Sequence, residues 1–288
     1  MKKIAILGCE NSHANNFLKY IRDNPELADI EVVGVYSDEK EPPEKLNAEY
    51  GVPIMKDYAD AVGAIDGLII TARHGANHYK YAKPYIGSGI PMFIDKPITV
   101  SEDEALEFMR ELKANGVRIS GGSSLKHAEV IAELRAKAES REGGATMGGP
   151  VRAPLASDSP YGGFYFYAQH LVEMVCEVFG RYPLSVKAYK AGNTKTVVFR
   201  YEGFDVTGLY CEGAYTYYAV RYAEKGEQGG SVDLKDAFDR EFDEFYKLLL
   251  GEEQRISYED FISPVFIMNA IERSLDSGNE EKVKEFNI

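Results

Sequence analysis

The stretch Ile90-Pro91-Met92-Phe93-Ile94-Asp95-Lys96-Pro97 decides how the first part of this chain folds. The apolar run from Ile90 to Ile94 is typical of a buried parallel strand, and the acid, lysine and proline after it mark the strand's carboxyl end. Pro91 is tolerated because it lies at the start of the strand. In an open α/β sheet, ligands bind beyond the carboxyl ends of the strands, so we expect Lys96 to face a cleft. A solvated lysine at a strand end is the alternative.

The segments around this strand alternate between short apolar runs and helical patterns. Ser101 and Glu104 form a capping box for one helix, which Gly116 ends. The alternation predicts an α/β domain over residues 1–122, with a doubly wound parallel sheet of about six strands. The other strands are expected near residues 3–8, 30–36, 52–55, 67–72 and 117–120, and the helices after residues 11 and 43 and over 78–86 and 101–114.

After Gly122 the pattern changes, and residues 123–288 are predicted to form an α+β domain. A glycine-rich stretch over 142–150 is expected to be a flexible linker. Consecutive apolar runs then predict a large, mostly antiparallel sheet. Strands are expected over residues 151–156, 184–190, 196–201, 205–211 and 216–222, and helices over 128–138, 168–179, 234–250 and 258–274.

Composition excludes several classes of function. The formal net charge of -13 argues against a nucleic-acid partner, because binding to phosphates needs a basic surface. No apolar run is long enough to cross a membrane. The three cysteines, Cys9, Cys176 and Cys211, are widely spaced and lack a metal-binding pattern, which favours a reduced, cytoplasmic protein.

Two motifs carry a resemblance to a known family. Asp95-Lys96-Pro97 resembles the Glu-Lys-Pro motif of the glucose-fructose oxidoreductase and inositol dehydrogenase family (Gfo/Idh/MocA). The segment from Gly162 to Glu173 resembles the family's glycine-rich entry to a helix that carries an Asp four residues before a His. The His matches as His170, whereas Phe166 stands in place of the Asp.

The resemblance implies an NAD-dependent oxidoreductase that acts on a sugar, cyclitol or related polyol, and a homo-oligomeric assembly. Lys96 and His170 would take the proton from the substrate hydroxyl while a hydride leaves for nicotinamide. Because Phe166 removes a carboxylate that would orient the imidazole, a packed, non-catalytic His170 is the alternative.

The first strand-to-helix turn, Gly8-Cys9-Glu10-Asn11-Ser12-His13, keeps only the first glycine of the G-x-G-x-x-G dinucleotide fingerprint. Glu10 adds bulk and negative charge where pyrophosphate would approach the backbone. The helix amino end, with Asn11, Ser12 and His13, could still receive an anion.

Other residues that we expect near the cofactor lie at strand ends. Ser37 and Asp38 stand where such folds meet the adenosine ribose, and the acid favours NAD over NADP; a charged surface turn is the alternative. Thr71, Arg73 and His78 are similar to the family's nicotinamide-side loop, and Asp95 belongs to the motif above. Arg73 could bind a phosphate or a substrate carboxylate, or be solvated, and His78 could cap or pack the helix.

Tyr161, Tyr165 and Tyr167 could contact a sugar-like substrate or form an aromatic packing cluster. Glu173, about one turn after His170, could supply a carboxylate to the site or simply pair at the surface. Two other functions stay open: a non-catalytic protein that binds a small ligand or partner after losing the cofactor through Glu10 and Phe166, and a metal-dependent enzyme. No tight metal motif supports the latter, so we predict no metal ligand.

Overall fold

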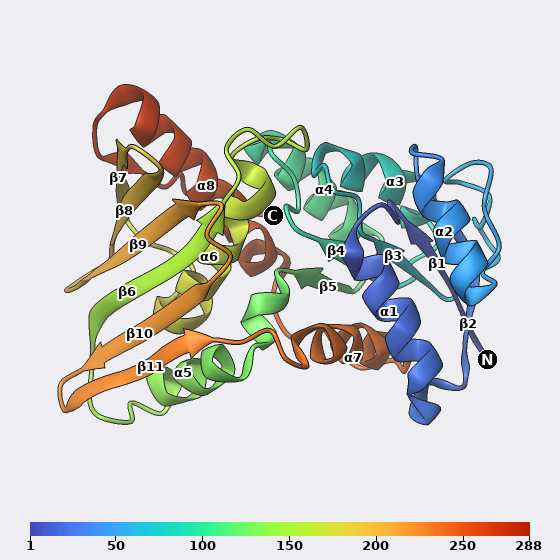
Figure 1. Ribbon diagram of the computed structural model, residues 1–288, viewed down its shortest axis with the longest axis horizontal. Coiled ribbons are helices and arrows are strands. Elements are labelled where there is room, and N and C mark those ends of the chain that lie inside the picture. The colour runs from blue at the N-terminus through green and yellow to red at the C-terminus, as the bar shows by residue number, and fades with distance from the viewer.

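The computed structural model describes residues 1–288 and contains two sheets (Figure 1). The first sheet is parallel, with the order β2-β1-β3-β4-β5. Its helices α1 to α4 alternate with the strands along the chain, as predicted. The strands are β1 (Lys2–Leu7), β2 (Ile30–Tyr36), β3 (Gly67–Ile70), β4 (Met92–Asp95) and β5 (Ile119–Gly122), and the helices are α1 (Ser12–Asp23), α2 (Glu41–Tyr50), α3 (Ala76–Ile86) and α4 (Glu102–Ala114).

The sixth strand, expected near residues 52–55, is reduced to a single parallel bridge between Val35 and Ile54. Pro53 lies next to this bridge and has no N–H to donate, so the pairing does not extend. The bridge still adds the segment beside β2, and the resulting order is the one found in dinucleotide-binding sheets. The capping box is confirmed only in part: the Ser101 hydroxyl accepts from the backbone N–H of Glu104, and α4 ends one residue before Asn115.

The second sheet has the order β11-β10-β6-β9-β8-β7-β12, and every neighbouring pair is antiparallel except β6 with β9. A mostly antiparallel second sheet is therefore confirmed. Its strands are β6 (Thr146–Leu155), β7 (Ser185–Ala191), β8 (Thr194–Arg200), β9 (Asp205–Glu212), β10 (Tyr217–Ala223), β11 (Gly226–Val232) and β12 (Glu281–Lys282).

The predicted linker over residues 142–150 is wrong in its second half, because β6 already begins at Thr146. Gly148 and Gly149 are needed there: an added Cβ would lie 2.3 Å from the Asp205 carbonyl oxygen and 1.9 Å from that of Val220. The glycines thus let neighbouring strands approach β6. The sequence pattern missed β11, which is rich in glycine and lacks apolar alternation, and the two-residue β12.

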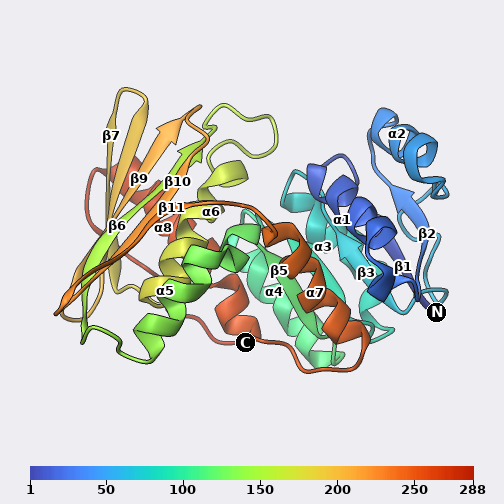
Figure 2. The same ribbon diagram turned by 60° about the horizontal axis from the view of Figure 1, so that its bottom comes forward.

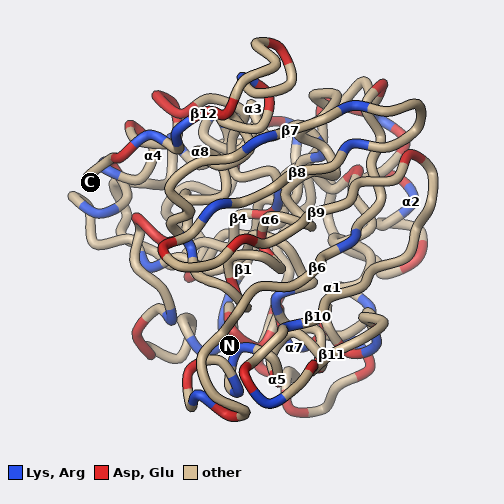
Figure 3. The backbone as a smooth tube through the Cα atoms, turned by 90° about the vertical axis from the view of Figure 1, so that its left-hand side faces the viewer, with Lys and Arg blue, Asp and Glu red and all other residues tan.

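Helices α5 (Glu129–Glu139), α6 (Tyr165–Phe179) and α8 (Tyr258–Ser277) cover the inner face of the second sheet. Figure 3 shows the opposite, outer face, which no helix covers. Tyr189, Tyr218 and Tyr222 are exposed on its strands. No helix of the structure is both long and apolar enough to span a membrane.

Helix α7 (Ala237–Leu249) returns to the first sheet, although it follows the strands of the second (Figure 2). Phe242, Phe245 and Leu249 share one buried core with residues of β1, α1 and β4. A Cβ on Gly67 of β3 would lie 2.4 Å from the Leu249 side chain, so the helix sits directly on the sheet. The hydrophobic core around the first sheet therefore includes residues of α7, which lie far beyond residue 122 in the sequence.

We expect Phe245→Ala to lower the free energy of unfolding by about 3–5 kcal/mol, because it removes a buried ring that joins α7 to the first sheet. The exposed neighbour Leu250 is the matched control, and Leu250→Ala should cost less than about 1 kcal/mol. Urea denaturation measures both. A loss for Phe245→Ala no larger than that of the control would contradict this packing.

Candidate active site

A cavity of about 410 Å³ lies where the carboxyl ends of the first sheet's strands meet the amino end of α6 and the loop before it. Both predicted catalytic residues, Lys96 and His170, line it. The structure therefore brings together two side chains that are 74 positions apart in the sequence. The complete lining is Asn11, Ser12, His13, Arg73, Lys96, Ser124, Tyr161, Phe166, Tyr167, His170, Tyr217, Leu234 and Phe238.

Lys96 follows β4 and is 4% exposed. Its ammonium group lies 4.7 Å from the ring centre of Phe166 and 5.7 Å from that of Tyr167, and no protein oxygen accepts a hydrogen bond from it. Burial lowers the pKa of Lys96 below its ordinary value, an effect that the charges of Asp95 and Glu241 only partly oppose. The neutral amine, which can accept a proton, is thus more accessible than in a free lysine.

Phe166 occupies the place of the expected carboxylate and changes how Lys96 is held. An aromatic face attracts a cation, but it accepts no proton and forms no salt bridge. The Phe166 ring also packs against Tyr161 and Tyr167, at 5.5 and 5.0 Å between ring centres. These rings form an apolar wall beside the amine.

His170 has an orienting partner that the sequence analysis missed. Its Nδ1 lies 2.7 Å from the Ser123 hydroxyl, in the turn between β5 and the short helix η2 (Ser124–His127). Burial, followed by the charges of Lys96 and His13, holds the pKa of His170 well below its ordinary value of 6.5. The imidazole is therefore neutral at pH 7. Ser123 directly follows β5, which ends two residues later than the predicted strand over 117–120, and a serine at a strand end is the signal that could have identified it.

Asp95 lies behind Lys96 and is fully buried. The Asn11 amide donates to its Oδ2 at 2.8 Å, and His13 Nδ1 lies 2.9 Å from the same oxygen. Burial alone would raise the pKa of Asp95, but His13 and then Lys96 lower it below the ordinary value. Glu241 of α7, also missed, lies 4.0 Å from His13 and has two buried oxygens without partners, and burial raises its pKa well above 4.5.

The amino end of α1 forms one side of the cavity and fits a dinucleotide pyrophosphate. No protein acceptor is present for the backbone N–H groups of Asn11, Ser12 and His13, so these donors are available to an anion. Gly8 has φ +75° and a Cβ there would lie 2.3 Å from the Ala72 nitrogen, so this position requires glycine. Thr71 is buried beneath it and donates its hydroxyl to the Gly8 carbonyl at 3.0 Å.

Glu10 does not point into solvent. Its carboxylate accepts from the Ser37 hydroxyl at 2.7 Å and from the backbone N–H of Arg73 at 3.0 Å, which joins the ends of β2 and β3. Asp38 accepts from the Tyr36 hydroxyl at 2.7 Å, and its side chain is 50% exposed, so it can still meet a ribose. Glu10 therefore places a negative charge between the end of β2, where Asp38 lies, and the end of β3, where Arg73 lines the cavity.

Eight of the fifteen predicted site residues are absent from the cavity lining: Gly8, Ser37, Asp38, Thr71, His78, Asp95, Tyr165 and Glu173. His78 is fully buried, with its ring nitrogens 2.9 and 3.1 Å from two backbone carbonyls, as in the packing alternative. The Tyr165 hydroxyl donates to Asn269, so its ring lies between helices.

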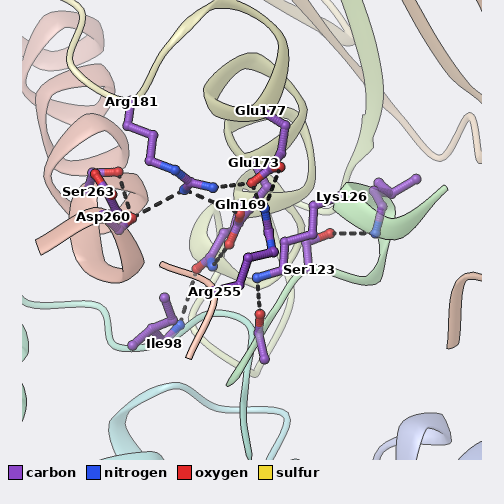
Figure 4. A network of polar contacts seen from close by, with 12 residues as sticks. Ile98, Ser123, Lys126, Gln169, Glu173, Glu177, Arg181, Arg255, Asp260 and Ser263 are labelled. Atoms are coloured by element: carbon purple, nitrogen blue, oxygen red, sulfur yellow. Dashed lines mark hydrogen bonds and ion pairs between the residues drawn. The ribbon is translucent and has the colours of Figure 1, made fainter. Parts of the chain in front are cut away.

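Glu173, also expected at the substrate, lies about one turn beyond His170 on α6, outside the cavity lining and within the polar network of Figure 4. There it accepts from the Gln169 amide at 2.9 Å, in a buried network that includes Glu177 and Arg181. One helical turn separates Glu173 from the cavity wall, and α6 is buried on nearly all sides, so the sequence alone could not assign its face. No group of three or more His, Cys, Asp or Glu side chains is arranged to hold a metal ion.

Comparison with known proteins gives one match to a family model. Residues 2–123 match the family model described as "Oxidoreductase family, NAD-binding Rossmann fold" (GFO_IDH_MocA). No curated protein matches the sequence.

Solved structures of low sequence identity share the whole fold. A putative myo-inositol dehydrogenase from Sinorhizobium meliloti 1021 has a TM-score of 0.85 at 16% identity, over 99% of this chain and 100% of that one. A myo-inositol dehydrogenase from Corynebacterium glutamicum has a TM-score of 0.86 at 16% identity, with the same coverage. GenD2 from gentamicin A biosynthesis, solved in complex with NAD, has a TM-score of 0.82 at 13% identity, over 99% and 97% of the two chains.

Two buried histidines predict how stability depends on pH. Burial holds the pKa of both His127 and His170 well below 6.5, so the unfolded chain binds these protons more readily than the folded one. Stability is then full above pH 6.5 and falls below it, by about 1.4 kcal/mol per pH unit for each histidine. His127 and His170 together contribute a free energy of unfolding that is about 2–3 kcal/mol lower at pH 5.5 than at pH 7.5. The lowered pKa of His78 adds to this difference and the raised pKa of Glu241 opposes it, so the contribution is measured by urea denaturation of matched variants.

His127→Gln should remove about half of this dependence, whereas the same change at the partly exposed His74 should leave it intact. The same pH dependence in His127→Gln and in the wild type would show that the buried His127 imidazole is not held neutral.

Proposed function

We propose that this chain belongs to the Gfo/Idh/MocA family of oxidoreductases, whose model matches residues 2–123, and that it transfers a hydride between NAD and a sugar, cyclitol or related polyol. The observation that carries the proposal is the unpaired Lys96 amine, which shares one cavity with His170 and the free amino end of α1. The inositol dehydrogenases of the same fold support the substrate class. The accessible Asp38 carboxylate favours NAD, because it would repel the 2′-phosphate of NADP.

The residues that would hold the cofactor are at the carboxyl ends of β1 and β2. The N–H groups of Asn11, Ser12 and His13 would bind the pyrophosphate, and Asp38 would accept from the ribose hydroxyls. Gly8 keeps the backbone close to β3 and leaves room above the turn. When bound, NAD supplies the nicotinamide that accepts the hydride.

The chain's own residues would handle the proton. The Lys96 amine accepts the proton of the substrate hydroxyl, and the resulting ammonium stabilises the remaining negative charge on oxygen. Ser123 fixes the ring of the neutral His170, so that its free nitrogen can hydrogen-bond the same or a neighbouring hydroxyl. Phe166 and Tyr167 contribute to the burial of the amine, and burial lowers the pKa of Lys96.

Lys96→Met tests the assigned proton acceptor, because it keeps the length of the side chain and removes the amine. We expect turnover of an accepted polyol to fall by about 10²–10⁴-fold, the usual contribution of a positioned acid or base. NADH affinity should change by less than about threefold, since Lys96 is not among the proposed pyrophosphate donors. The exposed Lys83→Met is the control. Turnover within about threefold of the wild type would remove Lys96 from this role.

Glu10→Gln tests the cofactor site. Removing a negative charge near the pyrophosphate should tighten NADH binding by about tenfold, which corresponds to roughly 1.4 kcal/mol of relieved repulsion. Calorimetric titration with NADH measures the change. If neither the wild type nor Glu10→Gln binds NADH in large excess, the chain is instead a non-catalytic ligand-binding member of the family.

The cytoplasmic location and the homo-oligomeric state stay predictions. The uncovered outer face of the second sheet, with Tyr218 and Tyr222 exposed, is the surface that we propose for contact with a second copy.

A further inference from the structure

Lys96 differs from every other buried cation of this protein in having no oxygen partner. Lys126 donates to the Gly121 carbonyl, Lys195 contacts Glu212 at 3.3 Å, and Arg221 donates to two backbone carbonyls and two side chains. A buried ammonium without an acceptor is costly, because it loses its hydration and gains no replacement. Because Lys96 lines the cavity, its amine can form a hydrogen bond with an oxygen atom of a ligand there.

Arg73 is a second cation on the same cavity that lacks an acid. Its Nη1 donates to the Tyr161 hydroxyl at 2.9 Å, and its guanidinium lies 5.1 Å from the centre of that ring. No carboxylate approaches the guanidinium within 4.0 Å, and most of its N–H donors have no acceptor. The positive charge of Arg73 also lowers the pKa of Lys96, so the two side chains of this cavity lie close enough to interact.

The charge of the cavity opposes that of the whole protein. The formal net charge is -13, yet the lining contains Arg73 and Lys96 and neither an Asp nor a Glu. The nearest acids face elsewhere. Asp95 is held behind Lys96 by Asn11 and His13, and Glu241 lies behind His13.

On the other side, Glu10 accepts from the backbone N–H of Arg73 and not from its guanidinium. Glu39 lies 3.5 Å from the Tyr161 hydroxyl, outside the cavity lining. Where the family resemblance led us to expect an Asp, Phe166 contributes no charge. The cavity is therefore built to favour a negatively charged ligand.

We propose that the substrate is an anionic polyol, a sugar acid or related hydroxy acid, whose carboxylate binds Arg73 while a hydroxyl meets Lys96. This inference rests on the proposed function and makes its substrate class narrower. A guanidinium with free donors binds a carboxylate through two parallel hydrogen bonds, which fixes the orientation of the ligand as well as its charge. Tyr161 holds the Arg73 side chain in place, so little conformational freedom is lost on binding.

A cofactor phosphate is the other anion that Arg73 could bind. The amino end of α1 already offers its N–H groups to the pyrophosphate, and Arg73 contacts Tyr161 of the second part of the chain, where the substrate would lie. Arg73 is therefore assigned to the substrate, and the two sources can be separated by experiment.

The test uses the full chain and matched pairs that differ at one carbon atom: glucuronate with glucose, and galacturonate with galactose. Calorimetric titrations are carried out with and without saturating NADH. At least one acid should bind at least about tenfold more tightly than its neutral partner, since a carboxylate gains charge-assisted hydrogen bonds that a CH₂OH group lacks. Equal affinity within a pair, or no binding of either acid, overturns the proposal.

Arg73→Gln should lower the affinity for the acid by at least about tenfold and leave the affinity for the neutral partner unchanged. The affinity of Arg73→Lys for the acid should lie between those of the wild type and Arg73→Gln. Arg22→Gln is the matched control, because Arg22 also stacks on a tyrosine at 5.1 Å but lies away from the cavity. If Arg73→Gln weakens NADH by the same factor instead, Arg73 is a cofactor ligand and the proposal fails.

Failure of the proposed function has a different signature. If the chain binds the acid selectively but neither binds NADH nor oxidises the acid, the anion-binding site is supported and the assignment as a dehydrogenase is wrong.

Discussion

The site depends on one buried amine that the protein leaves without a hydrogen-bond partner. Lys96 reaches the cavity because β4 ends at Asp95, and the next residue must leave the sheet at its carboxyl edge. The second part of the chain then covers the amine with the aromatic residues of α6 and of the loop before it. Burial lowers the pKa of Lys96 below its ordinary value.

Aromatic rings lie beside this amine where the family resemblance led us to expect a carboxylate, and this difference alters the balance of charge. An acid beside Lys96 would stabilise the ammonium and raise its pKa, whereas Phe166 stabilises it only weakly. The acids that remain, Asp95 and Glu241, lie behind the amine on the side of α1 and α7. The cavity therefore keeps a positive character that suits an anionic ligand, within a protein that is strongly acidic overall.

Local patterns predicted the first sheet and most of the second well, because the residue patterns that specify apolar strands and capped helices extend over only about ten residues. Lys96 and His170, which line one cavity, were predicted in the same way, from motifs at a strand end and at a helix start. Ser123 and Glu241 were not, because their roles arise from contacts with residues that lie far away in the sequence. The position of α7 on the first sheet was missed for the same reason: its apolar face is visible in the sequence, but its partner is not.

The most direct test of the account is the titration of the Lys96 amine itself. Reductive ¹³C-methylation followed by NMR, with Lys96→Met to assign the signal, would report the pKa of this group in the folded protein. The account predicts that Lys96 titrates below the ordinary value of 10.5, because it is buried beside aromatic rings and Arg73. A Lys96 signal that titrates at or above 10.5 would contradict it.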